Sequence, residues 1–135
     1  MLGSSPLDLL GSWQLARTIE DRLVGATSTV DGETILSAEA DGRIRWHETG
    51  ILHHGGNDVP VFRTLYVERS GDAWVVTFED GRDFHPWALD RDVVHPCGAD
   101  TYTGHVDVDS AERWTVTWTT LGPAKDYTMV SILTR

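Results

Sequence analysis

The stretch Gly11–Glu20, GSWQLARTIE, decides the fold because its apolar and polar side chains alternate. Trp13, Leu15 and Ile19 fall on one side of an extended chain, and most of the residues between them are polar. A period of two residues is typical of a β-strand with one buried face. We therefore expect a strand here, and the same period continues along almost the whole chain.

The later segments repeat this pattern and are separated by turn residues. A short helical turn is expected near the N-terminus, with Ser5 as N-cap and Pro6 in the first position. The segment 53–58, HHGGND, is interpreted as a mobile loop. Further strands are expected at 28–38 with a turn at Asp31-Gly32, at 44–52, 60–69, 73–79, 82–88, at 93–108 with a break at 96–98, and at 113–120 and 126–135.

These segments predict an all-β protein with about nine or ten strands joined mostly by tight turns, which is an antiparallel meander. An open sheet of that size would expose two edges and one apolar face. Closing the sheet into an up-and-down β-barrel removes both problems. A barrel of this strand number has an interior wide enough for one small ligand.

Length and composition indicate one soluble domain over residues 1–135. The formal net charge of −10 repels phosphate backbones and anionic headgroups, so we expect neither nucleic acid nor membrane as a partner. The N-terminus lacks the basic and apolar regions of a secretion signal, and Cys97 is the only cysteine. We expect a cytoplasmic protein that is a monomer or a homodimer.

The two ends of the chain support closure of the barrel. Gly11-Ser12-Trp13 opens the first strand and Arg135 ends the last one. In this the chain resembles the calycin superfamily (lipocalins, fatty-acid-binding proteins and relatives), in which a Gly-x-Trp on the first strand packs beneath a late arginine. The resemblance implies that the indole of Trp13 closes the bottom of the barrel and that the guanidinium stacks on it.

A closer resemblance rests on four motifs in the second half of the chain. The segments FEDGRDFH (78–85), HPCGADTYTG (95–104), W-x-x-x-W (114–118) and GPAKDY (122–127) are similar to those of an uncharacterised bacterial family, a domain of unknown function. The resemblance covers nearly the whole chain from LLGSWQLAR onward. It implies a calycin-like barrel and brings no established activity, cofactor or catalytic residue.

The orientation of His85 depends on the turn at Asp80-Gly81. A two-residue turn pairs Val76 with His85 and directs His85 into the barrel. A three-residue loop with Gly81 in the left-handed region instead directs Arg82 and Phe84 inward and His85 outward. The two-residue turn is the more common connection for Asp-Gly, so we favour the inward position.

The many aromatic residues predict a small-molecule-binding barrel with a hydrophobic or aromatic ligand in its cavity. An alternative is an acid–base enzyme, a lyase, isomerase or cyclase acting on a small hydrophobic substrate, with His85 as acid or base and Asp83 and Tyr102 beside it. The residues expected to line the cavity are Trp74, Phe78, Trp87, Tyr66, His95, Trp114, Trp118 and Tyr127.

Metal and cofactor binding are weakly indicated. His95 and Cys97 are too close in sequence for the usual paired-ligand signatures, and no CxxC or HxxxH pattern exists, so no metal site is predicted. No cofactor is expected either; haem held by His53, His54 or the pocket histidine is a minor alternative. Cys97 is interpreted as a small buried residue at a kink.

Overall fold

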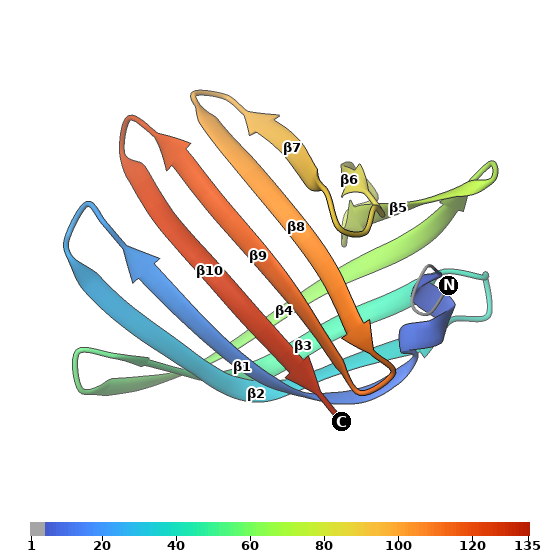
Figure 1. Ribbon diagram of the computed structural model, residues 1–135, viewed down its shortest axis with the longest axis horizontal. Coiled ribbons are helices and arrows are strands. Elements are labelled where there is room, and N and C mark those ends of the chain that lie inside the picture. Colours follow the sequence, from blue (N-terminus) through green and yellow to red (C-terminus); the bar gives the residue numbers. More distant parts are fainter. Residues whose placement is uncertain (1–4) are drawn as a thin grey trace.

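The computed structural model describes residues 5–135, which form ten strands after a short 3₁₀ turn (Figure 1). The turn η1 (Pro6–Leu9) has Ser5 as its N-cap, with the Ser5 hydroxyl accepting from the Leu7 amide, as predicted. The strands are β1 (Gly11–Asp21), β2 (Ala26–Ala38), β3 (Ile44–His54), β4 (Asn57–Ser70), β5 (Ala73–Phe78), β6 (Asp83–Pro86), β7 (Asp92–Cys97), β8 (Asp100–Ser110), β9 (Arg113–Gly122) and β10 (Lys125–Thr134).

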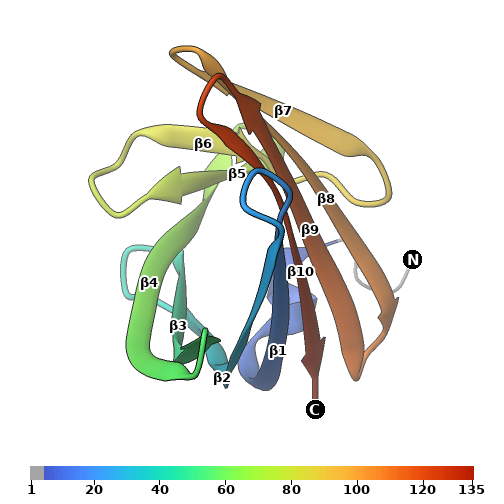
Figure 2. The same cartoon turned by 90° about the vertical axis from the view of Figure 1, so that its left-hand side faces the viewer.

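All ten strands belong to one antiparallel sheet with the order β6-β5-β4-β3-β2-β1-β10-β9-β8-β7. Pairing of β1 with β10 joins the two ends of the chain, as a closed meander requires. The sheet curls round until its two edge strands, β6 and β7, lie near each other (Figure 2). No ladder joins these two strands within residues 5–135. The predicted up-and-down barrel is therefore confirmed, and it is nearly closed.

The expected turn at Asp31-Gly32 is wrong, because β2 runs through both residues. Gly32 lies directly opposite Gly50 of β3. A Cβ atom at Gly32 would lie 2.0 Å from the carbonyl oxygen of Thr49, so the two strands approach more closely than any side chain would allow. Glycine is used here for a close approach of two backbones rather than for a turn.

Two other connections are tighter than the sequence indicated. The segment 53–58 is a hairpin in which Gly55 and Gly56 form the turn with φ values of +57° and +81°, so the predicted loop is wrong. The break near Pro96 is a second hairpin, in which Gly98 and Ala99 join β7 to β8. Left-handed backbone at glycine lets a two-residue turn join the flanking strands.

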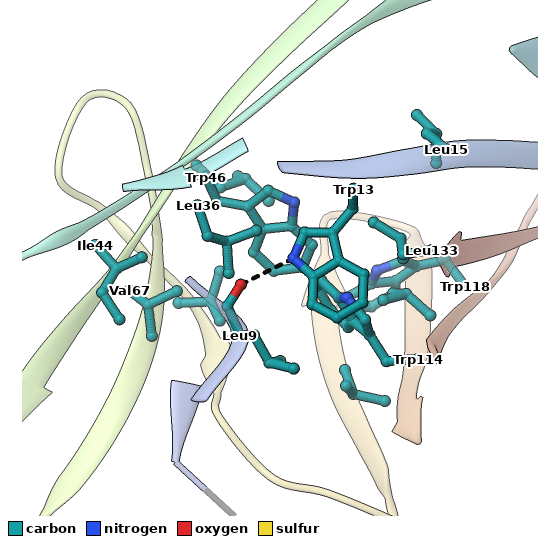
Figure 3. Close-up of a cluster of buried hydrophobic side chains, with 14 of the residues drawn as sticks. Leu9, Trp13, Leu15, Leu36, Ile44, Trp46, Val67, Trp114, Trp118 and Leu133 are labelled. Carbon is teal, nitrogen blue, oxygen red and sulfur yellow. Dashed lines mark hydrogen bonds between the residues drawn. The ribbon is translucent and has the colours of Figure 1, made fainter. Parts of the chain in front are cut away.

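The closed end of the barrel is filled by Trp13 and its neighbours (Figure 3). The side chain of Trp13 is 1% exposed, and its indole Nε1 donates a 2.8 Å hydrogen bond to the carbonyl oxygen of Leu9. Trp114 packs edge-on against Trp13, with the ring centroids 5.9 Å apart. The η1 turn thus contributes both an apolar side chain and a hydrogen-bond acceptor to this end of the barrel.

Arg135 stacks over the ring of the same indole. Its guanidinium carbon lies 3.9 Å from the ring centroid of Trp13, and its Nη1 donates to the carbonyl oxygen of Leu10 over 2.7 Å. The predicted arrangement of Trp13 beneath the last-strand arginine is confirmed. No helix within residues 5–135 has the length and apolar character needed to span a bilayer.

Replacement of Trp13 by Ala is expected to lower the free energy of unfolding by about 3–5 kcal/mol, the range for removing a large buried ring. Chemical denaturation followed by circular dichroism measures this loss. Trp74→Ala is the matched control, because Trp74 is only half-buried, and it should lose less than half as much. An equal loss of unfolding free energy in both variants would show that Trp13 is not essential for the packing of the closed end.

Candidate ligand-binding site

Aromatic side chains from four strands surround a cavity away from the closed end. The cavity has a volume of about 170 Å³ and is bordered by Phe78, Phe84, His95, Cys97 and Tyr102. Phe78 stacks on Phe84 with ring centroids 4.5 Å apart. His95 and Tyr102 are paired across β7 and β8, which places both side chains on the same inner face.

A wider cleft adjoins this cavity, because Phe78 and Phe84 border both. The cleft has a volume of about 630 Å³ and lies beside the part of β4 that has no partner on β5, since β5 pairs with β4 only from Leu65 to Ser70. Its other lining residues are Phe62, Arg63, Thr64, Leu65, Glu79 and Asp80. Together the cavity and the cleft form the candidate ligand-binding site.

The hairpin that carries His85 combines the two predicted registers. The Phe78 carbonyl accepts from the Gly81 amide, and Gly81 has φ +92°, so the connection is the longer loop and the predicted two-residue turn is wrong. An irregularity opposite Val76 then inserts one extra residue, Phe84, and restores the pairing of Val76 with His85. A bulge of this kind re-aims side chains. His85 is therefore inward, as predicted, and 5% exposed.

The imidazole of His85 is held as a neutral ring. Its Nδ1 lies 2.8 Å from the carbonyl oxygen of Pro86, which only accepts, so Nδ1 carries the proton and Nε2 is the acceptor. The pKa of His85 is lowered to about 4, mainly by burial and to a smaller extent by the charges of His95 and Arg63, against the raising effect of the Pro86 hydrogen bond. A neutral ring packs well edge-on against the stacked rings of Phe84 and Trp118, whose centroids lie 4.8 and 5.1 Å from that of His85.

The predicted acid–base trio is not assembled. Asp83 pairs with Thr77 and is exposed, because the three-residue loop places it on the outer side of the hairpin and the bulge that turns His85 inward comes only after it. Tyr102 faces the interior, where its hydroxyl oxygen accepts from Lys125 over 3.2 Å. His85 and Tyr102 thus lie inside the barrel without the carboxylate that the prediction placed beside them.

Three of the residues expected to line the cavity occupy other places. Trp114 is fully buried against Trp13 and Trp46, so it belongs to the closed end. Tyr66 lies on the outer face, where the guanidinium of Arg43 covers its ring at 3.9 Å. Tyrosine and tryptophan occur on both faces of a strand, so the residue type alone does not predict which face the side chain occupies. Trp87 lies toward the closed end, with its ring centroid 6.4 Å from that of Trp114.

The remaining predicted residues fall on the inner side of the barrel. Phe78 and His95 border the cavity itself, and Trp118 stacks on Phe84 beneath it. Tyr127 pairs with the buried Thr120, so it faces inward near the open end. Trp74 does not line the cavity, because it borders a separate cleft together with His85.

The sequence reasoning missed a charged network in the barrel interior. Thr34, Glu48 and Arg63 are directly opposite one another on β2, β3 and β4, and the side chain of Glu48 is 4% exposed. Glu48 Oε1 accepts from Arg17 Nη2 over 2.8 Å and from Arg63 Nη2 over 3.0 Å. The signal was present, because the alternation that buries Trp13 and Leu15 also directs Arg17 inward.

Glu48 is fully supplied with hydrogen bonds. Its Oε2 accepts from Thr34 Oγ1 over 3.1 Å and from Trp46 Nε1 over 3.3 Å, in addition to the two bonds at Oε1. Burial raises the pKa of Glu48, but the charges of Arg63 and Arg17 and the hydrogen bonds from Arg17 and Thr34 outweigh it, so the pKa lies below its ordinary value. The carboxylate is therefore ionised at neutral pH.

The other histidines and the cysteine do not form a metal site. Within residues 5–135 no three His, Cys, Asp or Glu side chains are grouped as metal ligands. His53 is on the outer face, bonded to Asp58 over 2.7 Å and to Asp31 over 3.1 Å, which raises its pKa. Cys97 is exposed at the cavity, so the prediction that it is buried is wrong.

The fold and the site define a nearly closed, up-and-down antiparallel β-barrel with a cavity lined by aromatic side chains. The chain belongs to the family of unknown function DUF6314, which matches residues 9–135. No curated protein matches the sequence.

Solved structures share the fold at low sequence identity. The S-type phycobiliprotein lyase CPES from Guillardia theta is 9% identical, with a TM-score of 0.69 over 96% of this chain and 89% of that one. A redesigned β-barrel, mFAP1, bound to DFHBI, is 17% identical, with a TM-score of 0.52 over 96% of each chain. At these identities the likeness shows the fold alone.

His85 should make the folded protein sensitive to acid. Between pH 7 and 4.5 the unfolded chain takes up a proton at His85 that the folded chain rejects until about pH 4. The protonation of His85 in the unfolded chain therefore lowers the free energy of unfolding by about 2.5 kcal/mol as the pH is decreased from 7 to 4.5. Denaturation of the wild type and His85→Gln at both pH values isolates the effect, since all other groups are shared. The same pH dependence in both proteins would contradict it.

Proposed function

We propose that this protein binds a small hydrophobic or aromatic molecule in the candidate site. The observation that carries the proposal is the cavity of about 170 Å³ whose walls are formed mainly by Phe78, Phe84, His95 and Tyr102. Apolar walls with a few polar groups are the usual composition of a small-molecule site. The stacked and edge-on contacts among Phe78, Phe84 and His95 support a ligand with a flat apolar surface, which could pack against these rings in the same way.

The shape of the barrel supports the same proposal. The wider cleft gives access from the surface to Phe78 and Phe84, because β5 leaves half of β4 unpaired. A barrel of the same fold, mFAP1, is described as bound to the small molecule DFHBI, and CPES is a lyase. Both are consistent with a barrel whose interior receives a small organic molecule.

An acid–base enzyme is the weaker candidate. Its support is His85, a neutral imidazole whose Nε2 is free of the Pro86 hydrogen bond. A pKa of about 4 makes this nitrogen a poor base at neutral pH, because effective general bases have pKa values near the working pH. With Asp83 outside, the site has the features of binding more than those of proton transfer.

Protection of Cys97 from modification tests the proposed function in the unaltered protein. Cys97 is the only cysteine, is exposed, and borders the cavity. We expect the uncharged fluorescent probe N-phenyl-1-naphthylamine to gain fluorescence on binding and to slow the reaction of Cys97 with a thiol reagent. At a probe concentration ten times its Kd, the slowing should be about tenfold by mass action.

The control carries its single thiol elsewhere. In the double variant Cys97→Ser, Thr128→Cys the cysteine lies on the outer face of β10, opposite Thr119, and the probe should not protect it. Fluorescence without protection of Cys97 would place the probe outside the cavity. If the probe neither gains fluorescence nor protects Cys97, the proposed function is overturned.

A further inference from the structure

The charged network in the interior has one more positive charge than negative. Arg17 and Arg63 both bond to one oxygen of Glu48, and the nearby His85 is neutral. A buried charge that lacks a counter-charge is unfavourable, so proteins pair such charges or use them to bind a ligand. The protein as a whole is strongly acidic, which makes an excess of positive charge inside it more notable.

Arg63 is the cation that Glu48 leaves incompletely bonded. A guanidinium has five N–H donors, and within residues 5–135 only Nη2 of Arg63 donates, to Glu48. Its Nε is buried without any partner in this part of the chain. Glu48 cannot supply more acceptors, because a carboxylate has about four acceptor sites and all four bonds to it are already made.

Arg17 differs from Arg63 in this respect. Its Nε donates to Ser131 Oγ over 2.7 Å and its Nη2 to Glu48, and its side chain is 11% exposed. The side chain of Arg63 is 33% exposed and borders the wide cleft together with Phe78 and Phe84. Arg17 and Glu48 therefore form the more buried ion pair, whereas Arg63 borders the cleft where we expect the ligand and keeps donors that have no partner within residues 5–135.

We propose that the ligand of this barrel carries a single carboxylate, which binds to the free donors of Arg63 while the apolar part lies against Phe78 and Phe84. This proposal rests on the proposed function, since it concerns the same site. A carboxylate matches the planar fork of a guanidinium and balances the one excess positive charge. A group with two negative charges fits less well, because Glu79 and Asp80 also border the cleft.

The test compares two probes that differ by one charge. N-phenyl-1-naphthylamine is uncharged, and 1-anilinonaphthalene-8-sulfonate is the same ring system with one anionic group. In Arg63→Met we expect the Kd of the anionic probe to rise about tenfold or more, the effect of losing one charge-assisted hydrogen bond. The Kd of the uncharged probe should change less than about twofold. Arg63→Lys should restore part of the affinity for the anion.

Two controls distinguish the loss of Arg63 from a general loss of positive charge and from misfolding. Arg45→Met removes a positive charge from the outer face of β3, opposite Tyr66, and should leave both probes unaffected. Arg63→Met is expected to fold because Glu48 keeps its bonds to Arg17, Thr34 and Trp46. Binding of the uncharged probe with near-normal affinity, together with cooperative unfolding, confirms the fold.

A competition experiment needs no variant. Dodecanoate should displace N-phenyl-1-naphthylamine from the wild-type protein at about tenfold lower concentration than dodecanol, which has the same chain length without the charge. If the acid and the alcohol are equally potent, or if Arg63→Met affects both probes equally, the proposal that the ligand carries a carboxylate is wrong. The proposed function is not affected by either of these results. Failure of both probes to bind the wild type would overturn the proposed function as well.

Discussion

The stacking of Arg135 on Trp13 is the contact on which the rest of the barrel depends. It joins residues from opposite ends of the chain, and the same guanidinium donates to the carbonyl oxygens of Leu10 and Ala111. Trp13 in turn bonds to Leu9, so η1, β1, the β8–β9 turn and β10 meet at one place. Because β1 and β10 are held side by side, every strand between them has one face inside the barrel. Which residues lie inside then follows from register, since side chains alternate with a period of two.

This alternation directs charged side chains inward as readily as apolar ones. Arg17 follows Trp13 and Leu15 on the inner row of β1, and Glu48 follows Trp46 on β3. Buried ions are tolerated only when they are paired and hydrogen-bonded. Glu48 meets this condition with four donors, and Arg17 meets it with Ser131 and Glu48. Arg63 meets this condition only in part, because some of its donors have no partner in the described chain. Arg63 is also the member of the network that borders the wide cleft together with Phe78 and Phe84.

The sequence was sufficient for the class of fold and the closed end, because each depends on alternation or on strand order alone. It was not sufficient for features that depend on the approach of separate strands. Asp31-Gly32 has the composition of a turn, yet Gly32 is needed for contact with Gly50, a partner many residues away. The exposure of Asp83 depends on the three-residue loop, and the inward position of His85 depends on the bulge at Phe84, neither of which the local sequence specifies. Long-range packing decided these positions, as it commonly overrides local preference.

The site lies where the sheet is least complete. β6 has four residues, no ladder joins it to β7 in the described chain, and β5 leaves part of β4 without a partner. Longer strands there would add hydrogen bonds and close the barrel, but they would also cover Phe78 and Phe84 and close the way to Arg63. The tryptophans at the closed end, such as Trp13 and Trp114, are buried because strands on every side pack against them. The well-packed closed end thus allows strand pairing to be incomplete at the other end. A binding site needs residues held in place by a rigid scaffold, and it does not need every strand of the barrel to be paired.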